Sequence, residues 1–528
     1  MARLGEILPR LLAARGIDTA FGIPGVHTVE FYRGLPGSGV THITPRHEQG
    51  AGFMADGYAR VTGRPAACLV ISGPGVTNIA TAMGQAYADS MPMLVISSVH
   101  ARGDLGRGEG RLHELQDQSA LAAGVAAFSR TVMEPAALEP ALDAAMAVFH
   151  GARPRPVHLE IPLDVLVAEA PEPGRPASHP ARPHPDAAAV AEAAQRLDAA
   201  NAPLLVLGGG AAGSPEAARG LAERLGAPVI PTINAKGILP PGHPLLVGSL
   251  LPEAPVRDAL EGADVVLAVG TELGETDTLL FDGRPRMRGD LIRVDIDPAQ
   301  LARNAPARIG IVSDAGAFCA ALTAELTRTH EGAGRAAALR DQVRPALDPA
   351  CLAHGRILDL VAAECPGLVV VGDSCQPVYG GNLTYDAPAP RSWFNSSTGF
   401  GTLGYGLPAA MGAKIARPDA PVVALIGDGG IQFTLPEIAT AVEAGLSLPI
   451  LLWNNRGYGE IKTYMRARDI PEIGVDILTP DFAVLAQGFG AEAVAARTPR
   501  ELVAALKAAF AAGRPTLIEI DDAVAREW

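Results

Sequence analysis

The chain has 528 residues, of which 48% are hydrophobic and 19% charged, and its formal net charge is −14. This length is enough for about three domains of ordinary size, each with its own apolar core. The acidic balance, without a Lys/Arg run, argues against nucleic-acid binding, and no uncharged apolar run is long enough to predict a membrane span.

The cysteines and the N-terminal residues indicate a cellular compartment. The five cysteines are scattered and lack the close spacing of a metal site, which is typical of reduced thiols in the cytoplasm. Residues 1–16 have the pattern of an amphipathic helix and not that of a signal peptide. We therefore expect a cytoplasmic protein.

Three regions of the chain alternate expected strands with expected helices, which is typical of parallel sheets. The expected fold class is α/β, with three doubly wound parallel-sheet domains at residues 1–170, 188–330 and 346–528. A Pro-rich linker at residues 171–185 separates the first two. The expected strands lie within residues 11–25, 63–75, 91–99 and 156–165, then 203–212, 228–237, 263–273 and 291–298, and finally 367–374, 421–426, 448–455 and 515–522.

Two histidines of the first region are candidates for acid–base chemistry. His27 lies in FGIPGVHT at residues 21–28, and His113 lies in GRLHELQDQ at residues 110–118. An imidazole titrates near neutral pH and can deliver a proton during a reaction. A surface or structural histidine is the alternative for His113.

The middle region carries Gly208-Gly209-Gly210 after an expected strand. Such a turn can receive a nucleotide phosphate, but the G-x-G-x-x-G pattern is incomplete, so the motif is weak.

The last region contains a pattern that predicts a site for a metal ion and a phosphate. The strand at residues 421–426 runs into Gly427-Asp428-Gly429-Gly430, and the strand at 448–453 ends in Asn454-Asn455-Arg456-Gly457-Tyr458. One strand–helix–strand unit separates the two parts, so they meet at the same edge of a parallel sheet. Oxygens of Asp428, Asn455 and Gly457 suit Mg²⁺, and the glycines let the backbone approach a phosphate. An ordinary strand-to-helix turn is the alternative.

These motifs resemble those of thiamine diphosphate (ThDP) enzymes of the decarboxylase and acetohydroxyacid synthase family, over nearly the whole chain. The resemblance implies that Asp428, Asn455 and the Gly457 carbonyl hold Mg²⁺ beside the diphosphate. The segment RHEQGA at residues 46–51 matches the place where family members set a glutamate against the aminopyrimidine ring. This residue is Glu48, which would promote the imino tautomer that removes the C2 proton.

Other cofactor contacts follow from the same resemblance. GTLGYGLP at residues 401–408 matches the segment that puts an apolar side chain, here Leu403, under the bent cofactor, with the Gly401 carbonyl at its 4′-amino group. Gln376 and Tyr458 are further expected contacts. Some relatives bind FAD in the middle domain, but GSLLPEA at 248–254 replaces their typical segment, so we expect no FAD.

The family also implies an assembly. Its cofactor lies between the first and last domains across a subunit boundary. We therefore expect a homodimer or a homotetramer, in which Glu48 serves a cofactor whose Mg²⁺ is held by Asp428 of the partner subunit.

The expected substrate is a small 2-oxo acid. The combined motifs resemble most closely the 5-guanidino-2-oxopentanoate decarboxylases, which form 4-guanidinobutanal. A guanidinium group favours carboxylates at the far end of the pocket, and Glu114, Asp117 and Glu460 lie in suitable loops beside His27 and His113. The expected activity is a ThDP- and Mg²⁺-dependent decarboxylation. The alternatives are an acetolactate synthase-like carboligase that joins 2-oxo acids and a cofactor-binding homologue without activity.

Overall fold

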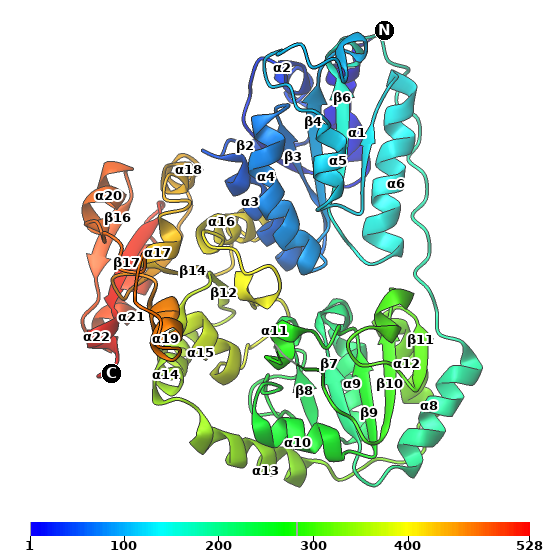
Figure 1. The fold of residues 1–528 in the computed structure, drawn as a ribbon, viewed down its shortest axis with the longest axis vertical. Helices are drawn as coiled ribbons and strands as arrows, with labels where there is room; N and C mark the ends of the chain where they lie inside the picture. The colour runs from blue at the N-terminus through cyan, green and yellow to red at the C-terminus, as the bar shows by residue number, and fades with distance from the viewer. Residues whose placement is uncertain (1, 281–282) are drawn as a thin grey trace. The chain divides into compact units, whose positions relative to one another are not determined.

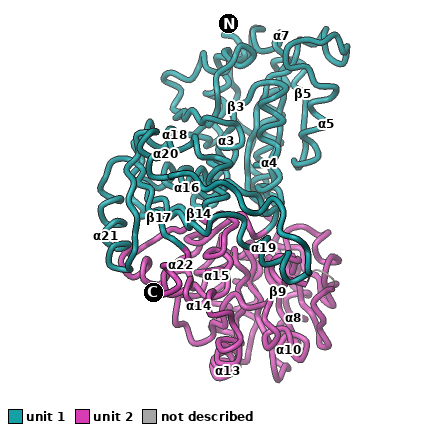
Figure 2. The backbone as a smooth tube through the Cα atoms, turned by 60° about the vertical axis from the view of Figure 1, so that its left-hand side comes forward, with its two compact units in different colours: residues 1–181, 399–521 teal, residues 182–398, 522–528 magenta. Residues whose placement is uncertain are grey.

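The computed structural model describes residues 2–280 and 283–528 and contains three parallel sheets of six, five and six strands (Figure 1). The prediction of three parallel α/β sheets is confirmed. The chain divides into two compact units. Unit 1 comprises residues 1–181 and 399–521, and unit 2 comprises residues 182–398 and 522–528 (Figure 2).

The first sheet lies in unit 1. Its elements are α1 (Leu4–Ala14), β1 (Thr19–Gly22), α2 (Val29–Tyr32), β2 (Thr41–Ile43), α3 (Glu48–Thr62), β3 (Ala66–Val70), α4 (Pro74–Ala88), β4 (Met93–Val99), α5 (Gln118–Ala123), β5 (Phe128–Thr131), α6 (Leu138–Gly151), β6 (Val157–Pro162) and α7 (Leu163–Leu166). The strand order is β2-β1-β3-β4-β6-β5. Ala67 and Leu69 of β3 pack against α1 and α6. Cys68 between them points to the opposite face, where its thiol donates to the Ala51 carbonyl of α3.

The second sheet lies in unit 2. Its elements are α8 (Ala187–Ala199), β7 (Leu204–Leu207), α9 (Pro215–Leu225), β8 (Val229–Pro231), α10 (Ala254–Gly262), β9 (Val265–Val269), α11 (Glu275–Thr278), β10 (Asp290–Asp295), β11 (Ile309–Val312), α12 (Ala315–Glu325) and α13 (Ala333–Val343). The order is β11-β10-β9-β7-β8. Leu205 and Leu207 face α8, α9 and α12, whereas Leu204 and Val206 face α10 and α13. Both faces of this sheet are therefore covered by helices.

The glycines after β7 are explained by contact with a neighbouring loop. The Gly210 N–H donates to the Gly270 carbonyl over 3.0 Å, and a Cβ on Gly208 would overlap the same carbonyl. Close approach of two backbones therefore accounts for the glycines of this turn.

The remaining elements include the expected phosphate and metal loop. They are α14 (Pro349–Glu364), β12 (Val369–Gly372), α15 (Gln376–Thr384), β13 (Trp393–Asn395), α16 (Gly406–Ala416), β14 (Val422–Gly427), α17 (Asp428–Ile431), α18 (Glu437–Glu443), β15 (Pro449–Asn454), α19 (Gly459–Arg466), α20 (Phe482–Gly488), β16 (Glu492–Ala495), α21 (Pro499–Phe510), β17 (Thr516–Asp521) and α22 (Asp522–Ala525). In unit 1 the strands run β14-β15-β17-β16, and in unit 2 β12 pairs with β13. Gly427 lies opposite Trp453, so Asp428 and Asn455 both follow at the carboxyl edge.

Helices α3 and α16 of unit 1 pack with their backbones close together. A Cβ on Gly57 would overlap the Ala409 carbonyl, and one on Gly412 would overlap the Met54 carbonyl. This contact fixes α3, whose first residue is Glu48, against the C-terminal part of unit 1. Among the described residues, no helix combines the length and the apolar character needed to cross a membrane.

Candidate active site

Asp428 lies at the carboxyl edge of the sheet and is only 1% exposed. Its Oδ2 accepts the Gly457 N–H over 2.9 Å, and its Oδ1 accepts the Asn455 N–H over 3.3 Å. Burial raises the pKa of Asp428 above its ordinary value, and these two N–H groups act in the opposite direction. A cation beside this carboxylate would offset the cost of burying its charge.

The two asparagines where β15 meets the following loop have different contacts. The Asn454 side chain donates to Glu519 over 2.7 Å and also accepts the Arg456 N–H. Its amide is therefore engaged away from Asp428, while the backbone of Asn455 and Gly457 contacts that carboxylate. Gly457 has φ 144°, a conformation that side-chain-bearing residues rarely adopt.

The loop also has support from residues further along the chain. The Tyr458 N–H donates to the Val475 carbonyl over 3.0 Å, and the Tyr458 ring lies where a side chain on residue 429 would be. Thr479 donates a long hydrogen bond of 3.4 Å to Asp428. Protein contacts thus hold the loop in shape.

The donor set at this edge is compatible with Mg²⁺ and a diphosphate. Within residues 2–280 and 283–528, no group of three or more His, Cys, Asp or Glu side chains is arranged to hold a metal. A cation at Asp428 would therefore need neutral oxygens from Asn455 and Gly457 together with phosphate oxygens and water. This is the combination that Mg²⁺ favours, because it keeps waters and commonly uses one or two carboxylates.

The segment that contains Gly401 and Leu403 belongs to unit 1 and is held there by hydrogen bonds at two points. Gly401 has φ 76°, and Leu403 is half-buried. The Thr402 N–H between them donates to Gln85 of α4 over 3.4 Å, and Thr434 donates to the Gly404 carbonyl over 2.8 Å. The two predicted cofactor contacts thus lie on a loop that is hydrogen-bonded to α4 and to the segment between α17 and α18.

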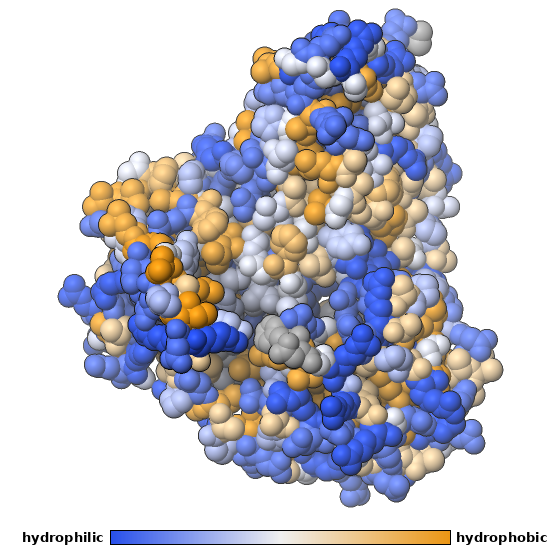
Figure 3. All heavy atoms as spheres, in the orientation of Figure 1, coloured by the Kyte–Doolittle hydropathy of each residue, from blue (hydrophilic) through white to orange (hydrophobic). Residues whose placement is uncertain are grey.

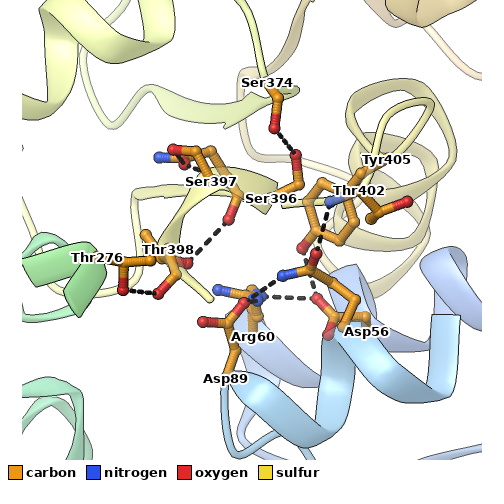
Figure 4. Close-up of polar contacts among 12 residues, drawn as sticks. Asp56, Arg60, Asp89, Thr276, Ser374, Ser396, Ser397, Thr398, Thr402 and Tyr405 are labelled. Atoms are coloured by element: carbon orange, nitrogen blue, oxygen red, sulfur yellow. Dashed lines mark hydrogen bonds and ion pairs between the residues drawn. The ribbon is translucent and has the colours of Figure 1, made fainter. Parts of the chain in front are cut away.

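Beneath this loop is a buried cluster of charged and polar side chains, the Arg60 cluster (Figure 4). Asp56 accepts hydrogen bonds from Arg60 over 2.6 Å and from the Tyr405 hydroxyl over 2.5 Å. Asp89 accepts from Arg60 over 2.5 Å and from Gln85 over 2.6 Å. Burial raises the pKa of Asp56, while the guanidinium of Arg60 opposes that rise. The cluster joins α3 and α4 to the residue before α16.

Glu48 is the first residue of α3 and is 9% exposed. Its Oε2 accepts a hydrogen bond from the Asn78 amide over 2.9 Å. The pKa of Tyr32 is raised by burial and by the negative charge of Glu48. The glutamate is therefore a buried, oriented carboxyl and not a solvated surface charge.

A histidine cluster, formed by His27, His100 and His113, lies at the carboxyl edge of the first sheet. The His27 ring centroid is 5.2 Å from that of His113 and 5.8 Å from that of His100. His27 Nδ1 contacts the Ser72 hydroxyl over 2.8 Å, and His100 Nε2 contacts the Leu112 carbonyl over 2.9 Å. Burial lowers the pKa of His27, and the two neighbouring imidazoles lower it further. His27 is thus neutral at neutral pH.

Our sequence-based prediction missed His100 and Ser72, although a signal was present. His100 follows β4 directly, Ser72 follows β3, and His27 lies after β1. These three strands are neighbours in the order β1-β3-β4. Parallel strands bring the residues after their carboxyl ends to the same edge, so a scan of strand ends would have found both side chains.

His113 has a conformation and an environment that are unusual for a surface residue. Its φ is 67°, which side-chain-bearing residues adopt mainly where the surroundings impose it. Its Nδ1 is buried and has no hydrogen-bond partner within the described part of the chain. This nitrogen can pair with a polar group that a ligand brings.

Two of the three predicted substrate carboxylates have local partners. Glu114 accepts the N–H groups of Gly108 over 2.9 Å and Arg111 over 3.0 Å, and these backbone hydrogen bonds, with that of Arg111 first, lower its pKa. Asp117 caps α5 by accepting the Ala120 N–H over 2.8 Å. Both side chains therefore shape the loop that carries His113.

Glu460 and Gln376 lie on other elements. Glu460 is an exposed residue in the first turn of α19, and no hydrogen-bond or ion-pair partner is found for it among the described residues. Gln376 is the first residue of α15 and belongs to unit 2.

Three family models match the chain. The model "Thiamine pyrophosphate enzyme, N-terminal TPP binding domain" matches residues 2–121, the central-domain model of the same family matches residues 190–322, and the C-terminal TPP binding-domain model matches residues 374–520. Together these matches cover more than half of the chain.

Curated relatives extend the similarity over nearly the full length. The chain is 48% identical to the Pseudomonas aeruginosa protein named "Probable 2-ketoarginine decarboxylase AruI", over 99% of this chain and 94% of the relative. It is 31% identical to the acetolactate synthase isozyme 1 large subunit of Escherichia coli, over 98% and 93%. Identity to the acetolactate synthase large subunit of Parasynechococcus marenigrum is 33%, over 96% and 86%.

Proposed function

This chain belongs to the thiamine pyrophosphate enzyme family, and from that premise we propose that it is a ThDP-dependent decarboxylase that converts 5-guanidino-2-oxopentanoate into 4-guanidinobutanal. Thiamine pyrophosphate and ThDP are the same cofactor. The observation that carries the proposal is the buried Asp428 carboxylate, which contacts the backbone of Asn455 and Gly457 beside a Gly-rich turn. Identity of 48% to a protein named as a 2-ketoarginine decarboxylase supports the substrate.

The proposed cofactor contacts lie in two parts of the chain, at Glu48 near the N-terminus and at residues between Gln376 and Tyr458. When bound, ThDP supplies a nucleophilic carbon that adds to the 2-oxo group and takes up the electrons released with CO₂. Asp428, Asn455 and the Gly457 carbonyl would hold Mg²⁺. The other contacts that we propose are Glu48, Gln376, Gly401, Leu403, Gly427, Gly429, Gly430 and Tyr458.

Proton movement would depend on Glu48 and the histidine cluster. Glu48, oriented by Asn78, would hold a proton at the ring nitrogen of the aminopyrimidine. His27 is neutral and in contact with Ser72, and His113 offers a buried nitrogen without a partner in the described residues. His27 is therefore a candidate to orient the substrate as a neutral hydrogen-bonding group, and His113 is a candidate to protonate the product.

We propose a homodimer or a homotetramer with active sites between chains. Large apolar side chains are exposed on the C-terminal part of unit 1, among them Phe433, Ile461, Tyr464, Ile473 and Leu478. Figure 3 shows apolar surface over the elements around α17, α18 and α20. Exposed apolar surface of this kind favours contact with another protein surface.

The experiment that tests the function is product analysis with purified full-length protein, ThDP and Mg²⁺. Separate reactions would contain 5-guanidino-2-oxopentanoate or pyruvate, and CO₂ release and products would be measured by mass spectrometry. We expect 4-guanidinobutanal from the guanidino acid and little conversion of pyruvate. Removal of Mg²⁺ with a chelator should abolish turnover, and added Mg²⁺ should restore it.

Acetolactate from pyruvate would contradict the proposal. It would support the carboligase function, which the relatives of 31% and 33% identity make the second candidate. In that case the histidine cluster would position a second 2-oxo acid.

Replacement of Glu460 with glutamine is expected to raise KM for the guanidino acid by about 10- to 100-fold, the usual range for a lost charge-assisted hydrogen bond. The reason is that Glu114 and Asp117 already accept backbone N–H groups. Of the three carboxylates, Glu460 is therefore the one that we expect to bind the guanidinium. Steady-state kinetics would measure the change. Conversion of 2-oxopentanoate, which lacks the cation, should be unaffected.

Glu114→Gln provides the comparison. If this variant raises KM for the guanidino acid selectively and Glu460→Gln does not, the substrate cation binds the loop that carries His113. The assignment to Glu460 would then be wrong.

A further inference from the structure

A buried glutamate that the sequence motifs did not reveal contacts the start of α3. Glu437, the first residue of α18, is 1% exposed. Its two carboxylate oxygens accept the Arg46 N–H over 3.0 and 3.2 Å, and Oε1 also accepts the His47 N–H over 3.1 Å. The Thr440 hydroxyl donates to it over 2.7 Å. The carboxylate is therefore engaged both with the two residues that precede Glu48 and with Thr440 of its own helix.

This contact lies where it can control the direction of Glu48. His47 is the N-cap of α3, and its Nδ1 accepts the Gln49 N–H over 3.1 Å. The N–H groups of Arg46 and His47 precede the helix and have Glu437 as their acceptor. The backbone of these two residues sets where α3 begins and so where its first side chain points. A misplacement of about 1 Å in a catalytic group can cost about 100-fold in rate.

The surrounding residues leave room for this contact and add to it. A Cβ on Gly50 would overlap Glu437 Oε1, so the absence of a side chain in the first turn of α3 makes room for the carboxylate. The same helix α18 also binds the Arg46 guanidinium, through Glu443 over 2.5 Å. Burial raises the pKa of Glu437 to about 6, so the group is an ionised acceptor at neutral pH and above.

We infer that Glu437 is a positioning residue for Glu48: it fixes the turn from which α3 begins and thereby aims the Glu48 carboxyl at the cofactor ring. The inference rests on the proposed role of Glu48. It also assigns a role to the short segment that runs from Asp428 in α17 to Glu437 in α18. One segment would thus carry a metal ligand at one end and the support of the proton-holding glutamate at the other.

The test compares Glu437→Ala, Glu437→Gln and Gly50→Ala with the matched control Glu443→Gln, all in the full-length protein. Glu443 lies on the same helix and contacts the same residue, but only through the exposed Arg46 side chain. Amide hydrogen exchange read by mass spectrometry, with and without ThDP and Mg²⁺, reports the turn directly. We expect exchange at residues 44–50 to speed up about tenfold or more in Glu437→Ala, because local opening follows the loss of backbone hydrogen-bond partners. Glu443→Gln should match the wild type.

The second readout separates positioning from general damage. The rate of deuterium exchange at C2 of bound ThDP, measured by acid quench and NMR, depends on Glu48 under the proposed function. We expect this rate to fall about 10- to 100-fold in Glu437→Ala and less in Glu437→Gln, which keeps one oxygen acceptor. The Kd of ThDP, set by the Asp428 loop, should change by less than about threefold, whereas a loss of fold would weaken binding as well.

Glu48→Gln makes the two possible failures distinguishable. If it leaves C2 exchange unchanged, the proposed role of Glu48 is wrong. If it abolishes C2 exchange while Glu437→Ala leaves that rate at the wild-type value, the positioning inference is overturned, whatever happens to amide exchange. Should Glu437→Ala fail to fold, Gly50→Ala takes its place: the added methyl displaces the carboxylate without removing it, and an unchanged C2 exchange rate there would equally overturn the inference.

Discussion

Replacement of Glu48 with glutamine is expected to lower turnover of 5-guanidino-2-oxopentanoate by about 10²- to 10⁴-fold, the usual contribution of a positioned acid or base. Glutamine has nearly the same shape and can still accept the Asn78 amide at the site where Oε2 now accepts it. Its amide can donate a hydrogen bond to the ring nitrogen, but it has no acidic proton to transfer. The measurement is CO₂ release at saturating ThDP and Mg²⁺, together with the Kd of ThDP.

The control for this prediction is Glu443→Gln, which replaces an exposed glutamate of the same unit and should keep wild-type turnover. Full turnover in Glu48→Gln would contradict the assigned role. Loss of ThDP binding in that variant, in place of slower turnover, would make Glu48 a structural residue of α3.

Local sequence patterns predicted the sheets and the proximity of Asp428 to Asn455 and Gly457, because the responsible signals are short-range. The strands β14 and β15 are buried apolar runs, and each ends at a polar or glycine residue that begins a loop. Their parallel register then brings Asp428 next to Asn455 and Gly457. Residue types, spacing and the rule that parallel strands share an edge were enough to predict that these three residues lie together.

The loop carboxylates show where residue type alone was insufficient. Glu114 and Asp117 are in the predicted loop, but both already accept backbone N–H groups. For Asp117 a signal existed, since an aspartate directly before a short helix is a common N-cap. The Glu114 contacts depend on a loop conformation with left-handed residues at Gly108 and Gly110, which sequence patterns do not specify.

The supports of the site could not be predicted because their partners are distant in sequence. Tyr405 and Asp56 are 349 positions apart, and Glu437 and Arg46 are 391 apart. Each pair forms because α3 packs against the C-terminal part of unit 1 and not because of any local pattern. Buried polar residues in helices were the available hint, since such groups need a partner.

Replacement of Arg60 with methionine is expected to lower the free energy of unfolding by about 3–5 kcal/mol, because it removes the guanidinium that contacts the buried carboxylates of Asp56 and Asp89. The side chains of Arg60, Asp56 and Asp89 are 4%, 0% and 2% exposed. Urea unfolding of the protein without cofactor would measure the loss. Arg64→Met is the matched control: its ion pair with Asp18 is about half exposed, and the expected loss there is below about 1 kcal/mol.

The pH dependence of this loss of stability, the deficit of Arg60→Met, shows whether it is caused by buried charge or by lost packing. Burial already raises the pKa of Asp56 while Arg60 opposes the rise, so removal of Arg60 should raise that pKa further. The folded variant then binds more protons than the unfolded chain, and its stability increases as the pH falls. The deficit of Arg60→Met should therefore shrink between about pH 8 and pH 5, and Asp56→Asn added to Arg60→Met should recover part of it at the higher pH. A deficit that is the same at both pH values would show that the arginine stem acts by packing, and that the charges of the Arg60 cluster do not hold α3 to the residue before α16.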